Sequence, residues 1–179
     1  TYYWGFSRYM PSVEYSPIYT DTFWQFTRTP QTDSGHDVYF TYRPQNPGDT
    51  TATSFRARCE YWTPGPTNND CAISSSGMGY LNPIDAHVDE WMDILIEVKF
   101  HDTNGVYKIW TRRPEVPNDY TLQADYSGPL GWFDDTPKYR LDFQLYGGGG
   151  FPLVVYYDEI KMTSSVAGSI TDVQPPTLQ

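Results

Sequence analysis

The sequence predicts an all-β protein, folded as an antiparallel two-sheet sandwich or jelly roll. Segments in which apolar and polar residues alternate recur along the chain, about eight to ten in number, and turns rich in Gly, Pro, Asn and Asp separate them. Aromatic residues make up 17% of the chain, and Tyr, the most abundant of them, is favoured in strands. Convincing amphipathic helices are lacking in the sequence, although residues 84–93 could carry one helical turn.

The clearest element is a β-hairpin over residues 90–113. Its first strand has an apolar and a polar face, with Leu95 as the exception: Ile94, Ile96, Val98 and Phe100 against Asp93, Glu97, Lys99 and His101. Residues 102–105 suit a tight reversal because they tolerate positive φ. The return strand alternates likewise: Tyr107, Ile109 and Thr111 against Val106, Lys108, Trp110 and Arg112. We expect a sheet with the core on one side and an accessible surface on the other.

The rest of the chain supplies further strands and two segments without them. Strands are expected over residues 2–10, 23–28, 37–43, 54–62, 139–146 and 153–162, with a short one within residues 74–83. Residues 114–137 hold four prolines and are expected to be irregular. We expect a single jelly-roll domain over residues 1–165. A C-terminal tail over residues 166–179 is expected to add nothing to the core.

Charge and hydropathy exclude two kinds of partner. The net charge is -10, whereas binding to nucleic acid phosphates requires an excess of Lys and Arg. No apolar run reaches the roughly 18–20 residues of a membrane span. The chain starts at Thr1 without Met, as a mature or trimmed product does, so we expect a secreted protein.

The two cysteines flank a turn-rich loop over residues 60–70. A disulfide between Cys59 and Cys71 would contribute roughly 2–4 kcal/mol by constraining the unfolded chain. The alternative is a pair of unrelated buried thiols. A secreted protein favours the disulfide, because such bonds persist in oxidising compartments.

Several stretches together resemble a known family. They are YYWGFSRYMP near the start, EWMDILIEVKF and NGVYKIW in the hairpin, and YRLDFQLYGGGG and VVYYDEIKM towards the end. In this order and spacing they resemble the jelly-roll polysaccharide lyases of the heparin lyase I and glucuronan lyase type, which are similar in plan to alginate lyases with a concanavalin A-like fold. The resemblance covers nearly the whole chain. An Arg/Glu motif that precedes these stretches in such families has no counterpart here.

The resemblance implies β-elimination on a polymer that contains uronic acid. A side chain must neutralise the carboxylate beside C5, and a Tyr or His must take the C5 proton and return one to the leaving oxygen. Carried over by position, Tyr146 matches the catalytic tyrosine and Gln25 matches a glutamine of the family. Two positions depart from the pattern, since Thr27 stands where the family has His and Asp142 where the alginate lyases have Lys.

The remaining candidates come from residue type and placement. Arg56 and Arg58 lie two apart, so they share a strand face and could clamp carboxylates, although surface ion pairs with the many acids are the alternative. Other candidates for substrate binding are Lys99, Lys108 and Trp110 on the hairpin, and Arg140 and Gln144 beside Tyr146. Candidates for the missing histidine are His101, which we include among the catalytic residues, and His36 and His87 in predicted loops.

Metal binding and glycoside hydrolysis are the competing chemistries. We expect no metal or cofactor, with calcium at the acidic pairs as the alternative, because hard cations take carboxylate oxygens. Those pairs are Asp134–Asp135 and Asp158–Glu159. Paired carboxylates could also hydrolyse a glycoside. However, the chain contains no Glu-x-Asp-x-x-Glu run, which weakens that interpretation.

Taken together, these features favour a secreted polysaccharide lyase that acts on an anionic, uronate-containing polysaccharide. Tyr146 would be the general acid and base, with Arg and Gln side chains neutralising the carboxylate. The alternative is a non-catalytic carbohydrate-binding or extracellular structural module on the same fold. The absence of the family's His and Lys favours this alternative, and the near full-length resemblance favours the lyase.

Overall fold

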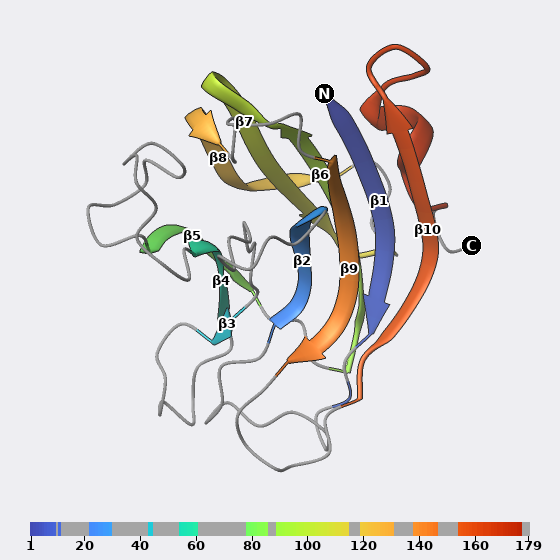
Figure 1. The fold of residues 1–179 in the computed structure, drawn as a ribbon. Helices are drawn as coiled ribbons and strands as arrows, with labels where there is room; N and C mark the ends of the chain where they lie inside the picture. Colours follow the sequence, from blue (N-terminus) through green and yellow to red (C-terminus); the bar gives the residue numbers. More distant parts are fainter. Residues whose placement is uncertain are drawn as a thin grey trace.

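The computed structural model describes an antiparallel β protein (Figure 1). The residues described are 1–9, 11, 22–29, 43–44, 54–60, 78–85, 89–114, 119–130, 138–146 and 154–176. Within β2–β5 and most of β9 the description covers the backbone alone. The described part holds ten strands and one short 3-10 helix, which confirms the all-β prediction.

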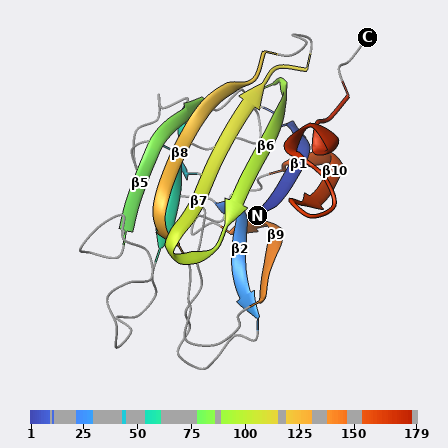
Figure 2. The ribbon, with the colours of Figure 1, turned by 90° about the horizontal axis from the view of Figure 1, so that it is seen from above.

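Ten strands form three hydrogen-bonded sheets (Figures 1 and 2). The five-stranded sheet has the order β10-β1-β6-β7-β8, namely Tyr156–Ser164, Tyr2–Tyr9, Trp91–Lys99, His101–Arg112 and Thr121–Leu130. A second sheet pairs β2 (Thr22–Thr29) with β9 (Lys138–Tyr146). The third joins β3, β4 and β5, namely Arg43–Pro44, Ser54–Glu60 and Met78–Asp85. β5 lies beside β8 (Figure 2).

The predicted hairpin is the middle of the five-stranded sheet. β6 and β7 pair antiparallel from Asp93 opposite Arg112 to Lys99 opposite Val106. β1 pairs with β6 along its whole length, from Tyr2 opposite Val98 to Tyr9 opposite Trp91. Cross-strand neighbours share a face of the sheet. The predicted apolar and polar faces of the hairpin are therefore confirmed.

One face of the five-stranded sheet, here called the inner face, carries the core. Its fully buried apolar side chains are Phe6, Met92, Ile94, Ile96, Val98, Tyr107 and Ile109. β9 lies over this face, because the ring of Phe143 meets Phe6 and Tyr157 edge to face at 4.9 Å between centroids in both pairs. Each fully buried apolar side chain of this core stabilises the fold by about 1.5–3 kcal/mol. This packing fixes which face of β9 is turned toward the core.

The opposite, outer face is partly covered by the C-terminal segment, contrary to expectation. Residues 165–176 fold back across β10, β1 and β6 and include η2 (Ile170–Val173). Val173 is 1% exposed, so the prediction that this tail adds nothing to the core is wrong. The tail is held at Lys161, whose Nζ donates to the carbonyl of Gln174 at 3.2 Å. Hydropathy missed the tail because it buries only two apolar residues, Val173 and Pro175, and is otherwise held by backbone contacts.

A buried ion pair lies beneath the C-terminal segment. Asp93 is 0% exposed and Arg112 is 4% exposed, and Arg112 Nε donates to Asp93 Oδ2 at 3.0 Å. Ser7 Oγ donates to Asp93 Oδ1 at 2.7 Å, and Arg112 Nη2 donates to the carbonyl of Pro175 at 3.0 Å. The guanidinium also lies 4.5 Å from the ring centroid of Tyr120, whose pKa is raised by burial despite the nearby positive charge. These contacts join β1, β6 and β7 to the C-terminal segment.

One other expectation about the path of the chain is wrong. The strand β8 lies within residues 114–137, the segment that was expected to be irregular. Its alternation is hidden because a register shift opposite Ile109 and Trp110 interrupts the pairing of β7 with β8. Residues 84–93 contain no helical turn among those described, since β5 ends at Asp85 and β6 begins at Trp91. The strand expected over residues 37–43 is described only at Arg43, in β3.

Gly5 allows the C-terminal segment to approach β1, and its replacement should loosen this contact. A Cβ on Gly5 would collide with the backbone carbonyl of Val173, which cannot move alone. We expect Gly5→Ala to lower the free energy of unfolding by about 1–3 kcal/mol in a urea titration. The control is Gly168→Ala, whose Cβ would meet side-chain atoms of Asp172 at 2.7 Å and Thr163 at 2.9 Å instead of backbone, so we expect a smaller loss. Equal losses in both variants would contradict this packing.

Removing one partner of the buried ion pair should be far more costly than removing a surface partner. Asp93→Ala leaves the buried guanidinium of Arg112 uncompensated, so we expect a loss of about 3–5 kcal/mol in the free energy of unfolding. The matched variant is Asp125→Ala, because Asp125 lies 3.6 Å from Lys108 in an exposed pair. It should cost about 1 kcal/mol or less. Comparable losses by calorimetry or urea titration would contradict the assignment of a buried, tightly bonded pair.

Candidate functional site

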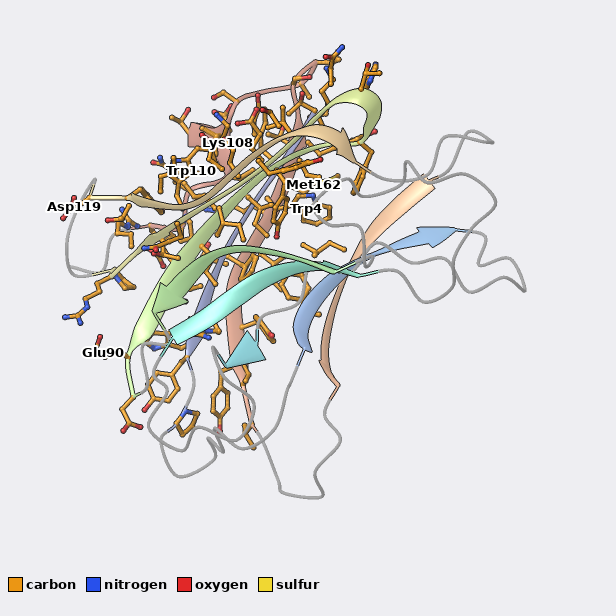
Figure 3. The ribbon with its side chains drawn as sticks, turned by 90° about the vertical axis from the view of Figure 1, so that its left-hand side faces the viewer. Trp4, Glu90, Lys108, Trp110, Asp119 and Met162 are labelled. Atoms are coloured by element: carbon orange, nitrogen blue, oxygen red, sulfur yellow. The ribbon has the colours of Figure 1, made fainter. Side chains whose placement is uncertain are left out.

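The predicted site residues fall into groups on different sheets. Lys99, Lys108 and Trp110 lie on the outer face of the five-stranded sheet, opposite Val106, Glu97 and Leu95 in the hairpin register. Gln25, Arg140, Gln144 and Tyr146 belong to β2 and β9, which cover the inner face. Figure 3 shows Lys108 and Trp110 on the side away from β2 and β9, with Trp4 and Met162 on the nearer side. One binding groove cannot include both groups, since the sheet separates them.

On the outer face, the hairpin residues form a mixed polar and apolar surface. Lys108 lies between Glu97 on β6 and Asp125 on β8, and its Nζ is 3.6 Å from the Asp125 carboxylate. Trp110 lies between Leu95 and Leu122. The predicted sharing of one face by Lys99, Lys108 and Trp110 is confirmed.

His101 forms hydrogen bonds within the reversal that joins β6 to β7. Its Nδ1 accepts hydrogen bonds from the backbone N–H groups of Thr103 and Asn104, both at 3.1 Å. An accepting Nδ1 requires a neutral ring with the proton on Nε2. His101 lies in β7 opposite Leu130 of β8, in a different sheet from β2 and β9. The pairing therefore does not bring His101 together with Gln25 or Tyr146, and its catalytic role stays a prediction.

The register of β2 with β9 places Gln25 beside other candidate site residues. Gln25 lies opposite Asp142, and Thr27 lies opposite Arg140. Diagonal neighbours on one face of an antiparallel pair lie within about 7–8 Å of each other. Strand alternation places these four positions on the face opposite to Phe143, which is turned toward the core. Gln25 and Arg140 are thus neighbours on the face of the β2–β9 pair that is opposite to Phe143.

Tyr146 lies beyond an irregularity in β9. It is opposite Thr22, whereas Phe143 is opposite Trp24, so β9 contains one more residue than β2 in this interval. Such a bulge re-aims the side chains that follow it, and bulges are frequent beside active sites. Simple alternation from Asp142 therefore does not carry through to Tyr146. The sequence pattern of alternating residues could not reveal this shift, because the extra residue is defined only by the partner strand.

The arginine pair and the cysteines are placed only in part. Arg56 and Arg58 lie in β4, opposite Pro83 and Tyr80 of β5. Among the described strands, no hydrogen-bonded pairing joins β4 to β2, so the pairing does not place these arginines in one sheet with Gln25. Cys59 lies in β4, and Cys71 is outside the described residues. The disulfide stays a prediction.

The acidic pairs and the remaining histidines are placed only in part. Asp134, Asp135, His36 and His87 lie outside the described residues. Asp158 accepts a hydrogen bond from the N–H of Glu159 at 2.8 Å, and Glu159 lies 3.4 Å from Lys161 Nζ. The described residues contain no group of three His, Cys, Asp or Glu side chains that could hold a metal ion. They also contain no helix of the length and apolarity that a bilayer span requires.

Sequence reasoning missed a buried polar pair between the sheets. Arg8 is 0% exposed and lies on the inner face, opposite Tyr157 of β10 and Met92 of β6. Burial raises the pKa of Tyr157, and the charge of Arg8 opposes this effect. The available signal was the spacing of Arg8 two residues after Phe6, which assigns both to the core face of β1. Because Tyr157 packs against Phe6 and Phe143, we assign this pair to the core rather than to a site.

Comparison of the sequence with protein-family models and with curated proteins finds no match.

A substitution of His101 tests whether it acts in the turn. We expect His101→Ala to lower the free energy of unfolding by about 1 kcal/mol, because two backbone N–H groups lose their acceptor. His101→Asn should retain most of the stability, since an Asn side chain can accept from the N–H two residues further on. Amide hydrogen exchange at Thr103 and Asn104 reports the same loss locally. Unchanged exchange in His101→Ala would contradict the role in the turn.

Proposed function

We propose that this protein is a secreted, two-sheet polysaccharide lyase that cleaves a uronate-containing polysaccharide by β-elimination. One observation carries the proposal: the register of β2 with β9 makes Gln25 and Arg140 neighbours on the face of that strand pair opposite to Phe143. An amide and a guanidinium on one strand face suit a carboxylate, since Arg donates in a fork that matches its two oxygens. The stretches that resemble the lyase family include both strands.

The chemistry follows from what elimination requires. Arg140 and Gln25 would donate hydrogen bonds to the substrate carboxylate, with Gln144 as a further donor, and so stabilise the charge that develops when C5 loses its proton. Tyr146, as its phenolate, would accept the C5 proton, and the electrons of that C–H bond would form the C4–C5 double bond. The C4–O bond then breaks, and the leaving oxygen receives the proton from Tyr146. The bulge before Tyr146 would set its direction toward the sugar.

A second candidate function rests on the departures from the family pattern. Asp142 lies directly opposite Gln25, where a like charge would repel a substrate carboxylate. Thr27, opposite Arg140, cannot carry a proton as the family's His does. A non-catalytic carbohydrate-binding or structural module on this fold would retain the strands and tolerate both residues. The two candidates differ in whether the polymer is cleaved.

The deciding experiment is incubation with a panel of polymers: glucuronan, alginate, heparin-type and pectic polysaccharides. Elimination creates an unsaturated uronate whose ultraviolet absorbance rises with time. We expect the native protein to cleave at least one polymer, and Tyr146→Phe to lower the rate by about 10²–10⁴-fold, since a positioned acid or base contributes that much.

The control variant is Tyr139→Phe, which removes a hydroxyl from the same strand at the position opposite Arg28. It should keep the rate of the native protein. A flat absorbance trace with every polymer, together with measurable binding to one of them, would overturn the lyase proposal in favour of the binding module. Equal rates in the native protein and Tyr146→Phe would overturn the role of Tyr146.

A further inference from the structure

The outer face of the five-stranded sheet is covered over only part of its width. The C-terminal segment contacts β10, β1 and β6 and reaches β7 at Arg112 through the carbonyl of Pro175. Beyond this point, β7 and β8 carry side chains that remain accessible, with Leu122 46% exposed and the side chain of Lys108 33% exposed. The outer face therefore has a buried half and an accessible half.

Five residues define the accessible half, here called the outer platform: Trp110, Leu122, Lys108, Glu97 and Asp125. Trp110 is half-buried and lies opposite Leu95, which is 2% exposed, and opposite the exposed Leu122. A register shift at Ile109 and Trp110 produces the second of these pairings. At this shift, Gln123 Nε2 donates a hydrogen bond to Thr111 Oγ1 at 2.9 Å. The indole of Trp110 thus lies between the buried Leu95 and the accessible Leu122.

Charged side chains lie next to the Trp110 indole, on one side of it. Lys108 is two residues before Trp110, and it lies between the carboxylates of Glu97 and Asp125. Its contact with Asp125 is an exposed pair at 3.6 Å, which contributes little to stability and can open to a ligand. Together the three groups offer hydrogen-bond acceptors and a donor with a net charge of one negative, from two carboxylates and one ammonium.

This chemistry selects one class of ligand. An aromatic ring presents a flat apolar surface to the C–H face of a pyranose, and the carboxylates accept hydrogen bonds from its hydroxyl groups. Lys99, two residues from Glu97 on the same face, balances the remaining negative charge, so this surface has no net positive charge to attract a uronate. A neutral hexopyranose or pentopyranose carries hydroxyl donors and acceptors and no charge. The outer platform is complementary to such a neutral sugar.

We propose that the outer platform is a second carbohydrate site, which binds neutral sugar units of a polysaccharide on the opposite side of the five-stranded sheet from the β2–β9 pair. It goes beyond the proposed lyase, because its ligand is uncharged and its residues take no part in elimination. Such a site would hold the protein on a mixed polymer or cell wall while the other sheet contacts uronate. A failure of this second site can therefore be distinguished from a failure of the lyase proposal, because the two involve different ligands and residues.

Affinity electrophoresis of the full chain tests this site. The protein is run in native gels that contain a soluble β-glucan, a mannan or a xylan. We expect at least one of these polymers to retard the native protein, and Trp110→Ala to weaken the apparent affinity about tenfold, as expected when a stacked aromatic side chain is lost. Trp110→Tyr should stay within about threefold of the native protein, because it keeps an aromatic face.

The matched control is Trp91→Ala, which removes another tryptophan of the outer face, packed against Tyr9 at 5.6 Å between ring centroids. It should bind like the native protein, and thermal melting of each variant would test that it is folded. Absence of retardation of the native protein by all three polymers would overturn the proposal, as would equal retardation of Trp110→Ala. Sedimentation that reveals a dimer lost in Trp110→Ala would also overturn it, since a second copy would then be the occupant.

Discussion

The buried pair of Asp93 and Arg112 is the constraint on which the five-stranded sheet depends. It joins the two strands of the central hairpin, takes a hydrogen bond from Ser7 on β1, and holds the C-terminal segment at the carbonyl of Pro175. A buried pair is weak evidence for stability by itself, because its desolvation offsets its attraction. It does fix register and path, since each group would be left unpaired in any other arrangement. The C-terminal segment covers the pair and keeps water from it.

This constraint divides the molecule's surfaces. The C-terminal segment closes over Asp93, Gly5 and Arg112, so this part of the outer face is covered, whereas side chains of β7 and β8 beyond it remain accessible. The inner face is occupied by the core and by β9 through Phe143. Two faces are left for the proposed ligands: the face of the β2–β9 pair opposite to Phe143, which carries Arg140 and Asp142, and the outer platform, which carries two acids beside Lys108.

The sequence was sufficient for features that depend on local pattern. Alternation predicted the hairpin and its core face, since residues such as Ile94 and Ile96 repeat with the period of a strand. It could not predict that Asp93 and Arg112 are buried, because burial of charge depends on a partner and a cover that lie far away in the chain. The face of Tyr146 and the strand β8 were also hidden, since bulges shift the alternation. For the site, the family resemblance suggested Gln25 and residue placement suggested Arg140, but only the register of β2 with β9 makes them neighbours.

Hydrogen–deuterium exchange in the presence of an acidic oligosaccharide tests the central claim most directly, namely that the β2–β9 pair contacts a uronate polymer. The measurement compares the rate of amide exchange in each strand with and without a saturating glucuronate or alginate oligosaccharide. The account predicts slower exchange in β2 and β9, around Gln25 and between Arg140 and Tyr146, with β7 and β8 unchanged. Slower exchange around Trp110 with β2 and β9 unchanged, or no change in any strand, would contradict it.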